Sequence, residues 1–375
     1  MLPFSRLLDA LKQIPDPRRD QGKRYPLPYL LLFSILAILS GAKGFSDIII
    51  FMEQRLNVLN EVFGINLKRA PSINTVRVLL HTLGCDCLET ALRTHAESLL
   101  TGEHAEMLPI IALDGKTLRG SVDHFNDRKA AHILSAFATG NAILLAHAEV
   151  DDKTNEIPCV QALIRELGLA GVLYTGDGMQ CQKKTFEAAE ETGSYVLAQV
   201  KANQPTLLAT LQEIAATKPI TDHHETKDKI AHGRQERRIV DTFAGDRLGA
   251  DWLGADWDGL IAAAARVTRL TWHKDTKSGL WHLTEEISFY VCQTALSARA
   301  FGAAIRGHWG VESNHYVRDV TLHEDESRIR IKPVNFARLR SIALNVLRAN
   351  GIKNIARALY KNALRVENVL SYSLS

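Results

Sequence analysis

Three acidic residues stand where they could act together on a phosphate ester. Asp114 ends the short apolar run PIIALD and Asp177 ends the run GVLYTGD, so each is expected at the end of a β-strand. Glu312 lies in a stretch with helical spacing. Carboxylates are the oxygen ligands that Mg²⁺ prefers, and pairs of such ions catalyse phosphoryl transfer. The sequence therefore predicts either a metal-dependent phosphoryl-transfer site or three unrelated surface acids.

The helix that carries Glu312 has an unusual face. Residues three and four apart are neighbours on a helix, which places on one side Ile305, His308, Glu312, Tyr316 and Asp319. Polar atoms are costly to bury without partners. A face with two acids and a histidine is therefore expected to line a site or a polar network.

Hydrophobic periodicity predicts the elements that must position these acids. Residues 1–105 show helical patterns throughout, and short apolar runs typical of strands begin at about residue 107. ILSAFAT and AILLAHAEV flank Gly140-Asn141 and predict a β-hairpin. Helices and strands then alternate to about residue 217. This order predicts a mixed α/β sheet with both aspartates near strand ends.

The alternation stops between about residues 218 and 293. The runs AHGRQERRIVDTF, AAAARVTRLTWH and WHLTEEISFYVCQ predict an antiparallel insertion, and helix returns from Ser297. We therefore expect a helical N-terminal DNA-binding domain at 1–105. A catalytic domain at 106–375 would carry the β-rich insertion and basic C-terminal helices.

Charge is distributed unevenly, although the net charge is only +3. No acid occurs from Ser327 to Val366, a segment with ten basic residues: Arg328, Arg330, Lys332, Arg338, Arg340, Arg348, Lys353, Arg357, Lys361 and Arg365. A block of one sign favours a polyanion-binding surface, with a solvated helix face as the alternative.

Other classes of protein and site fit less well. Neither a GxxxxGK[ST] phosphate loop nor a GxSxG elbow occurs, and the five cysteines lack a paired CxxC framework, which favours a reducing cytoplasm. The apolar run Leu27–Ala42 is short of the roughly 20 residues that span a membrane. His223, His224 and His232 could bind zinc, although a solvated loop is the simpler interpretation.

Two further segments could touch DNA. The stretch 71–83 predicts a helix capped by Ser72, with Asn74, Thr75 and Arg77 where a helix-turn-helix protein places its contacts; an ordinary surface helix would look similar. Lys201 and Asn203 follow a strand and could either contact a phosphate or form a simple turn.

Seven segments occur together in one order: DPRRDQGKRYPL, PSINTVR, ALDGKTLRGS, GDGMQCQKKT, VKANQ, HGRQERR and HWGVESNHYVRDVTLHEDESRIR. With this set the chain resembles bacterial insertion-sequence transposases of the DDE class, in the group that includes the H-repeat-associated proteins. The resemblance covers nearly the whole chain.

The resemblance implies an RNase H-like core, a mixed five-stranded sheet with helices. It implies catalytic roles for Asp114, Asp177 and Glu312, which would hold two Mg²⁺ ions, with Mn²⁺ as an alternative. DNA contacts are expected in or near the shared motifs, from Arg77, Lys116, Arg119, Lys201, Asn203, His232, Arg234, His308, Trp309, Arg328 and Arg330.

The chain departs from the family pattern near two of the acids. Gln180 stands where the family often has histidine. Related groups carry Tyr, Arg and Lys around the glutamate, where this chain has Ile305, His308 and Asp319. We therefore expect Arg306 or Arg318 to supply the missing phosphate contacts.

These features favour a cytoplasmic bacterial DNA transposase, nucleoid-associated when it acts, that cleaves and joins element ends. Its partners would be the double-stranded terminal repeats and target DNA, with a homodimer assembled on DNA and no membrane association. A metal-dependent nuclease without strand transfer is one alternative. A catalytically decayed DNA-binding regulator is the other.

Overall fold

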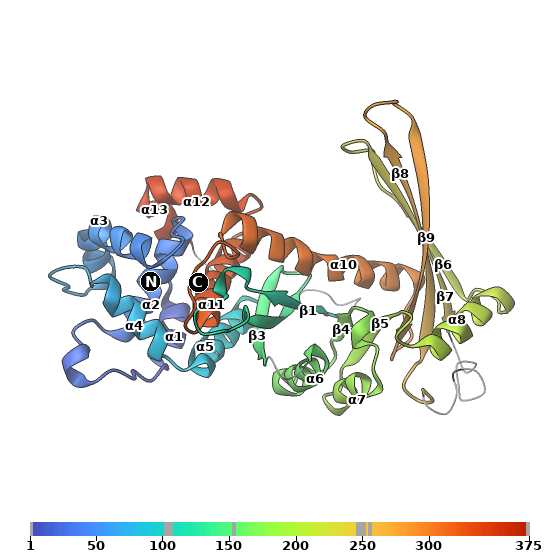
Figure 1. Ribbon diagram of the computed structural model, residues 1–375, viewed down its shortest axis with the longest axis horizontal. Coiled ribbons are helices and arrows are strands. Elements are labelled where there is room, and N and C mark those ends of the chain that lie inside the picture. The colour runs from blue at the N-terminus through green and yellow to red at the C-terminus, as the bar shows by residue number, and fades with distance from the viewer. Residues whose placement is uncertain (1–2, 101–107, 152–154, 245–252, 254–256, 373–375) are drawn as a thin grey trace. The chain divides into compact units, whose positions relative to one another are not determined.

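The computed structural model describes residues 3–100, 108–151, 155–244, 253 and 257–372 (Figure 1). The chain folds into two compact units. The first combines Met1–Glu103, Gly115–Asn155 and Gly310–Ser375, and the second combines His104–Asp114 and Glu156–Trp309. Strand β1 (Ile110–Thr117) and helix α10 (Ala298–Tyr316) each contribute residues to both units.

The first unit is mainly helical. Its N-terminal helices are α1 (Ser5–Lys12), α2 (Leu27–Leu39), α3 (Phe45–Phe63), α4 (Ile73–Thr82) and α5 (Cys85–Leu99). The C-terminal helices are α11 (Pro333–Ala349), α12 (Ile355–Leu364) and α13 (Val366–Leu370). Ser72 caps α4 as predicted, because its hydroxyl accepts a hydrogen bond from the Thr75 amide at 3.3 Å. This unit confirms the predicted helical N-terminal region.

Helix α11 forms the centre of the first unit, where it packs against α2, α5 and β3 (Figure 1). Two arginines of the predicted basic surface are buried in it. Arg338 is 3% exposed and its Nε donates to Glu89 Oε2 at 2.7 Å, while Arg340 is 2% exposed and donates to the Lys43 carbonyl at 3.0 Å. The prediction of one continuous polyanion-binding block was therefore wrong at these positions, because burial and pairing with glutamate cannot be seen in the local charge pattern.

The predicted hairpin is present in the same unit. Strands β2 (His132–Ala138) and β3 (Ile143–Val150) pair antiparallel around Gly140-Asn141. Strand β2 is buried after His132, and β3 is buried from Ile143 to His147, which agrees with their continuous apolar runs.

The second unit contains the parallel strands and the insertion. Strands β4 (Leu173–Gly176) and β5 (Tyr195–Val200) lie parallel, and β4 also pairs in parallel with β1. The accompanying helices are α6 (Glu156–Leu167), α7 (Lys183–Glu191) and α8 (Pro205–Thr217). With β1 shared by both units, the strand order β3-β2-β1-β4-β5 gives the mixed sheet predicted for an RNase H-like core.

The β-rich insertion is also confirmed. Its strands are β6 (Asp222–Lys227), β7 (Arg234–Ala244), β8 (Ala263–Lys274) and β9 (Trp281–Cys292), all paired antiparallel. The last residues of β9 pair with β5, which joins the insertion to the core sheet. Within the described residues, no helix is long and apolar enough to cross a membrane, and the apolar helix α2 is buried instead.

One buried histidine of the first unit makes a testable prediction about pH. His95 on α5 is 1% exposed, neither ring nitrogen has a partner within the described part of the chain, and burial lowers its pKa to about 4. In the unfolded chain the His95 imidazole is protonated near pH 6.5, whereas in the folded chain it is protonated only near pH 4. The stability that depends on a neutral His95 is therefore fully present above pH 6.5 and is lost as the pH falls toward 4. Through this residue, the free energy of unfolding should fall by about 3 kcal/mol between pH 6.5 and pH 4.

Thermal unfolding measured from pH 7 to pH 4 will check this expectation. His95→Leu should flatten the fall in stability, whereas His124→Leu, at an exposed histidine, should leave it unchanged. Equal pH profiles for wild type and His95→Leu would refute it.

Candidate active site

Asp114 lies within β1, and Asp177 directly follows β4, the parallel neighbour of β1. β1 and β4 pair in the register Ile110–Leu173 to Ala112–Thr175. Asp114 follows Ala112 by two residues and Asp177 follows Thr175 by two, so each aspartate comes two residues after the last pair of this register. Both residues are partly exposed. Asp177 directly follows β4, as predicted. The prediction that Asp114 ends its strand was wrong, because β1 continues beyond it to Thr117.

The loop after β4 is built to hold the Asp177 carboxylate. Its Oδ1 accepts a hydrogen bond from the Met179 amide at 2.9 Å, which makes Asp177 the cap of a short 3₁₀ turn. Asn203 donates from Nδ2 to the Gly178 carbonyl at 2.8 Å, and Gln204 donates from Nε2 to the Cys181 carbonyl at 2.9 Å. The amide of Asn203, a predicted DNA contact, is therefore engaged in shaping this loop.

Lys201 lies across the same loop. A Cβ built on Gly178 would lie 2.6 Å from Lys201 Cδ, so the lysine stem passes directly over the glycine backbone. The side chain stays exposed and has no ion pair within the described residues. The stem of Lys201 therefore lies over the residue that follows Asp177, and the proposed phosphate contact of its ammonium stays a prediction.

His308 lies on α10 against the end of β4. Its Nδ1 is 3.0 Å from the Thr175 hydroxyl, which precedes Asp177 by two residues. Burial lowers the pKa of His308, while the Asp177 charge opposes that shift. A neutral imidazole can both donate and accept, so His308 can tie the helix to the strand that precedes the second acid.

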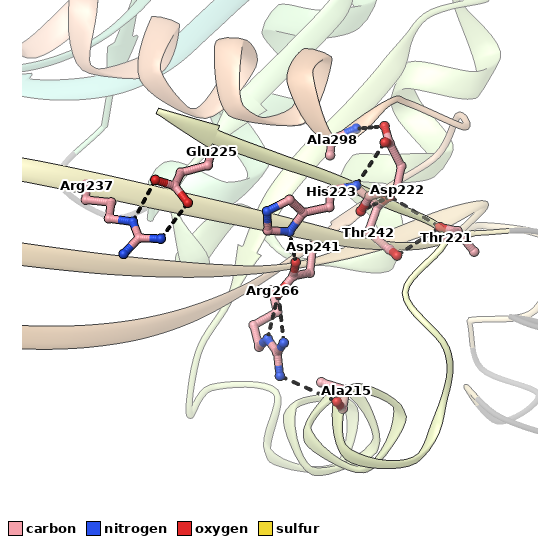
Figure 2. A network of polar contacts seen from close by, with 10 residues as sticks. All are labelled: Ala215, Thr221, Asp222, His223, Glu225, Arg237, Asp241, Thr242, Arg266 and Ala298. Atoms are coloured by element: carbon pink, nitrogen blue, oxygen red, sulfur yellow. Dashed lines mark hydrogen bonds and ion pairs between the residues drawn. The ribbon is translucent and has the colours of Figure 1, made fainter. Parts of the chain in front are cut away.

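The insertion fixes the first half of α10. The Asp222 carboxylate of β6 accepts a hydrogen bond from the Ala298 amide at 2.8 Å, which satisfies the first turn of the helix (Figure 2). Two turns later, Arg306 donates to both carboxylate oxygens of Asp228, at 2.7 and 2.8 Å. Arg306, an expected phosphate contact, is thus held by the insertion.

Trp309 is covered by arginines from two insertion strands. The guanidinium of Arg238 lies 4.3 Å from the indole centroid and that of Arg269 lies 5.5 Å from it, both within cation–π range. Base stacking on this face of Trp309 would require Arg238 to move. Sequence reasoning missed both arginines, although Arg234, Glu236 and Arg238 alternate along one face of β7.

We predict that Trp309→Leu loosens α10 from the insertion, whereas Trp309→Phe retains much of the cation–π contact. Each exposed cation–π pair contributes about 0.5–1 kcal/mol, so the leucine variant should lose roughly 1–2 kcal/mol. Amide hydrogen exchange in residues 298–309 measures this directly. Equal exchange rates in Trp309→Leu and Trp309→Phe would contradict a stabilising contact between Trp309 and the two arginines.

Glu312 follows His308 by one helical turn on α10 and is exposed. The predicted face did not extend to Asp319, because Val317–Thr321 forms a π-helical turn that breaks the spacing. Arg318 in this turn is fully buried and pairs with Glu324 at 2.9 Å. The prediction that Arg318 contacts phosphate was therefore wrong.

Lys116 is buried in an ion cluster of the first unit. Its ammonium pairs with Asp319 and lies 3.7 Å from Glu324 and 3.6 Å from Asp325. A DNA contact by Lys116 would require this cluster to open. Sequence reasoning missed the cluster because its acids follow Lys116 by some 200 residues.

The remaining predicted DNA contacts are exposed at the surface. Arg119 is 81% exposed and lies 3.7 Å from Asp325, and exposed side chains are also found at Arg77, Arg328 and Arg330. His232 and Gly233 form the turn between β6 and β7 with positive φ angles, and Arg234 donates to Glu236 at 2.8 Å. The HGR motif thus has a clear structural role in this turn.

The donor chemistry of the site suits a divalent cation. Mg²⁺ is usually bound by one or two carboxylates together with water and substrate phosphates, which matches the Asp114–Asp177 pair. Among the described residues, no group of three or more histidine, cysteine, aspartate or glutamate side chains is arranged for a metal ion. The histidines once considered for zinc include His223, whose Nδ1 instead lies 2.7 Å from Asp241 (Figure 2).

Two family models match successive parts of the chain. Residues 8–96 match the family described as DDE_Tnp_1-associated, and residues 106–347 match the transposase DDE domain. The chain belongs to the transposase DDE domain family. Membership implies transposase enzyme activity, and members of this family typically use divalent metals.

Relatives of similar length occur in Escherichia coli. The H repeat-associated putative transposase YhhI of strain K12 is 29% identical over 362 residues, which cover 92% of this chain and 90% of that protein. The putative transposase YncI of E. coli O157:H7 is 28% identical and covers 97% of this chain and 94% of that protein. These similarities confirm the family suggested by the ordered motifs.

A solved structure to which the chain is similar is the piggyBac transposase synaptic complex with hairpin DNA. It has a TM-score of 0.42 and 11% sequence identity over 98% of this chain and 80% of that chain. At this level of similarity, the fold is better judged from the strand order described above.

Proposed function

We propose that this DDE transposase moves an insertion sequence by cleaving DNA at the element ends and joining them to target DNA, with Asp114, Asp177 and Glu312 as its catalytic acids. The observation that supports the proposal is the parallel register of β1 and β4, whose last pair, Ala112–Thr175, precedes each aspartate by two residues. Glu312 is proposed as the third acid because the segment HWGVE that carries it resembles the segment of the third catalytic acid in the family.

The proposed chemistry consists of two displacements at phosphorus. Water attacks the phosphodiester at the element end, and the 3′-oxygen leaves with a proton. The freed 3′-hydroxyl then attacks a target phosphodiester, whose own 3′-oxygen leaves. Two bound Mg²⁺ ions, or Mn²⁺ in their place, would activate the attacking oxygen and stabilise the leaving one. The three carboxylates would hold these ions.

The protein's own groups would position the DNA and neutralise its charge. The Met179 amide holds the Asp177 carboxylate, and Lys201, whose stem lies over Gly178, would bring a cation near it. Protein side chains take little part in the making and breaking of covalent bonds in this scheme. Positioning and electrostatic stabilisation would therefore supply most of the rate enhancement. We propose Arg77, Arg119, Arg328 and Arg330 as exposed contacts to the DNA backbone.

The DNA partners would be the terminal repeats of the element and the target duplex. Because two ends must be brought together, we propose a homodimer assembled on DNA. A nuclease without strand transfer would use the same acids, and a decayed regulator would bind DNA without cutting it. The retained pair of aspartates favours a catalytic protein over the regulator.

The test uses purified full-length protein and a labelled duplex that ends in the inverted repeat flanking its own gene. Nicking at the repeat boundary with Mg²⁺, and none with EDTA, is expected. DNA binding without cleavage in either Mg²⁺ or Mn²⁺ would favour the regulator and refute the proposal.

A further inference from the structure

A basic pocket lies in the first unit between residues 351–354, helix α12 and the end of α13. Its volume is about 420 Å³, and its lining includes Lys353, Asn354, Arg357, Lys361 and Tyr372. Helices α12 and α13 lie together in Figure 1. The three cations come from the C-terminal half of the basic segment, beyond the buried arginines of α11.

No acid in the described part of the chain neutralises these three cations. All three residues are exposed, and none forms an ion pair with an acid in the described part of the chain. Arg357 and Lys361 are four residues apart on α12, where like charges repel and destabilise a helix. An anion bound between them would remove that cost.

The rest of the pocket is firmly built and adds polar groups. Asn362 is 2% exposed; its Nδ2 donates to the Leu39 carbonyl at 2.8 Å and lies 3.0 Å from the Tyr372 hydroxyl. Asn354 accepts a hydrogen bond from the Arg357 amide at 2.9 Å and so caps α12 at the edge of the pocket. The positive end of the α12 dipole therefore adds to the three side-chain charges.

We propose that this pocket binds the phosphodiester backbone of duplex DNA through Lys353, Arg357 and Lys361. The proposal rests on the proposed function, since that function requires a long duplex to be held. Arg357 and Lys361 rise about 6 Å along the helix, so they can face successive phosphates of one strand. Such contacts position the DNA and carry no sequence information.

The experiment compares duplex binding by fluorescence anisotropy across a salt series, in EDTA so that no cleavage occurs. The test variant is Lys353→Gln/Arg357→Gln/Lys361→Gln. The charge-matched control is Lys12→Gln/Lys23→Gln/Arg237→Gln, whose cations pair with Asp9, Asp20 and Glu225. At 0.1 M salt, the test variant should bind the duplex at least about tenfold more weakly than wild type. The slope of the logarithm of its binding constant against the logarithm of the salt concentration should fall in magnitude by about 3. The control should match wild type.

A second titration distinguishes a site for free phosphate from a site for the phosphates of the DNA backbone. Inorganic phosphate is added at constant ionic strength, and its binding is followed by calorimetry. Saturable phosphate binding by wild type, together with equal duplex binding by wild type and test variant, would identify a free-anion site and overturn the proposal. Equal duplex binding without phosphate binding would overturn it as well. If wild type itself bound no duplex at low salt, the proposed function would fall, which is a distinguishable result.

Discussion

Asp114→Asn and Asp177→Asn are each expected to abolish DNA cleavage while leaving DNA binding intact. Both substitutions keep the shape of the side chain but remove the negative charge that a divalent cation requires. We expect a loss on the order of 10³-fold or more in the cleavage rate, equivalent to about 4 kcal/mol of transition-state stabilisation. Glu312→Gln should behave in the same way. Single-turnover cleavage of an end-containing duplex measures the rate.

The matched control for these variants is Asp258→Asn, at an exposed aspartate of the second unit. It should cleave like wild type. Binding in EDTA must be equal for all four variants, which separates lost chemistry from lost folding. Near-normal cleavage by either Asp114→Asn or Asp177→Asn would rule out that carboxylate as a metal ligand.

Gly120→Ala is expected to cause the largest loss of stability. A Cβ at this position would lie 2.4 Å from the Ser327 carbonyl oxygen and 2.6 Å from that of Asp325. Both contacts are to backbone atoms, so the clash cannot be relieved by moving a flexible side chain. The backbone around Asp325 and Ser327, which follows the π-helical turn, must shift instead. Overpacking of this kind costs about 3 kcal/mol. The change should also weaken the Lys116–Asp325 pairing beside it.

Urea denaturation measures this loss, with Gly44→Ala as the control. A Cβ at Gly44 would meet no heavy atom within 4 Å, and its φ of −159° is extended backbone that alanine adopts. The control should stay within about 0.5 kcal/mol of wild type. Equal unfolding midpoints for the two variants would contradict the packing of Gly120 against that loop.

Periodicity was enough to predict the fold because its signals are local. The apolar runs around Gly140-Asn141 indicated the β2–β3 hairpin, and runs ending in Asp114 and Asp177 indicated β1 and β4. Parallel strands end at the same edge of a sheet, so the order of the elements allowed the two aspartates to converge, but it equally allowed two unrelated surface acids.

Long-range contacts could not be predicted in this way. Lys116 has the local features of a DNA contact, and only the folded chain shows its pairing with Asp319. The face expected from Ile305 to Asp319 assumed a regular helix, which the π-helical turn interrupts. The covering of Trp309 by Arg238 depends on an insertion whose position relative to α10 is not encoded in spacing.

Strand transfer is the measurement that tests the account most directly. Wild-type protein is incubated with Mg²⁺, a labelled duplex carrying the element end and a supercoiled target plasmid. We expect a cut that leaves a 3′-hydroxyl at the element end and labelled strands joined to the plasmid, with neither product formed by Asp114→Asn. Cutting without any joined product would contradict a transposase and identify a nuclease.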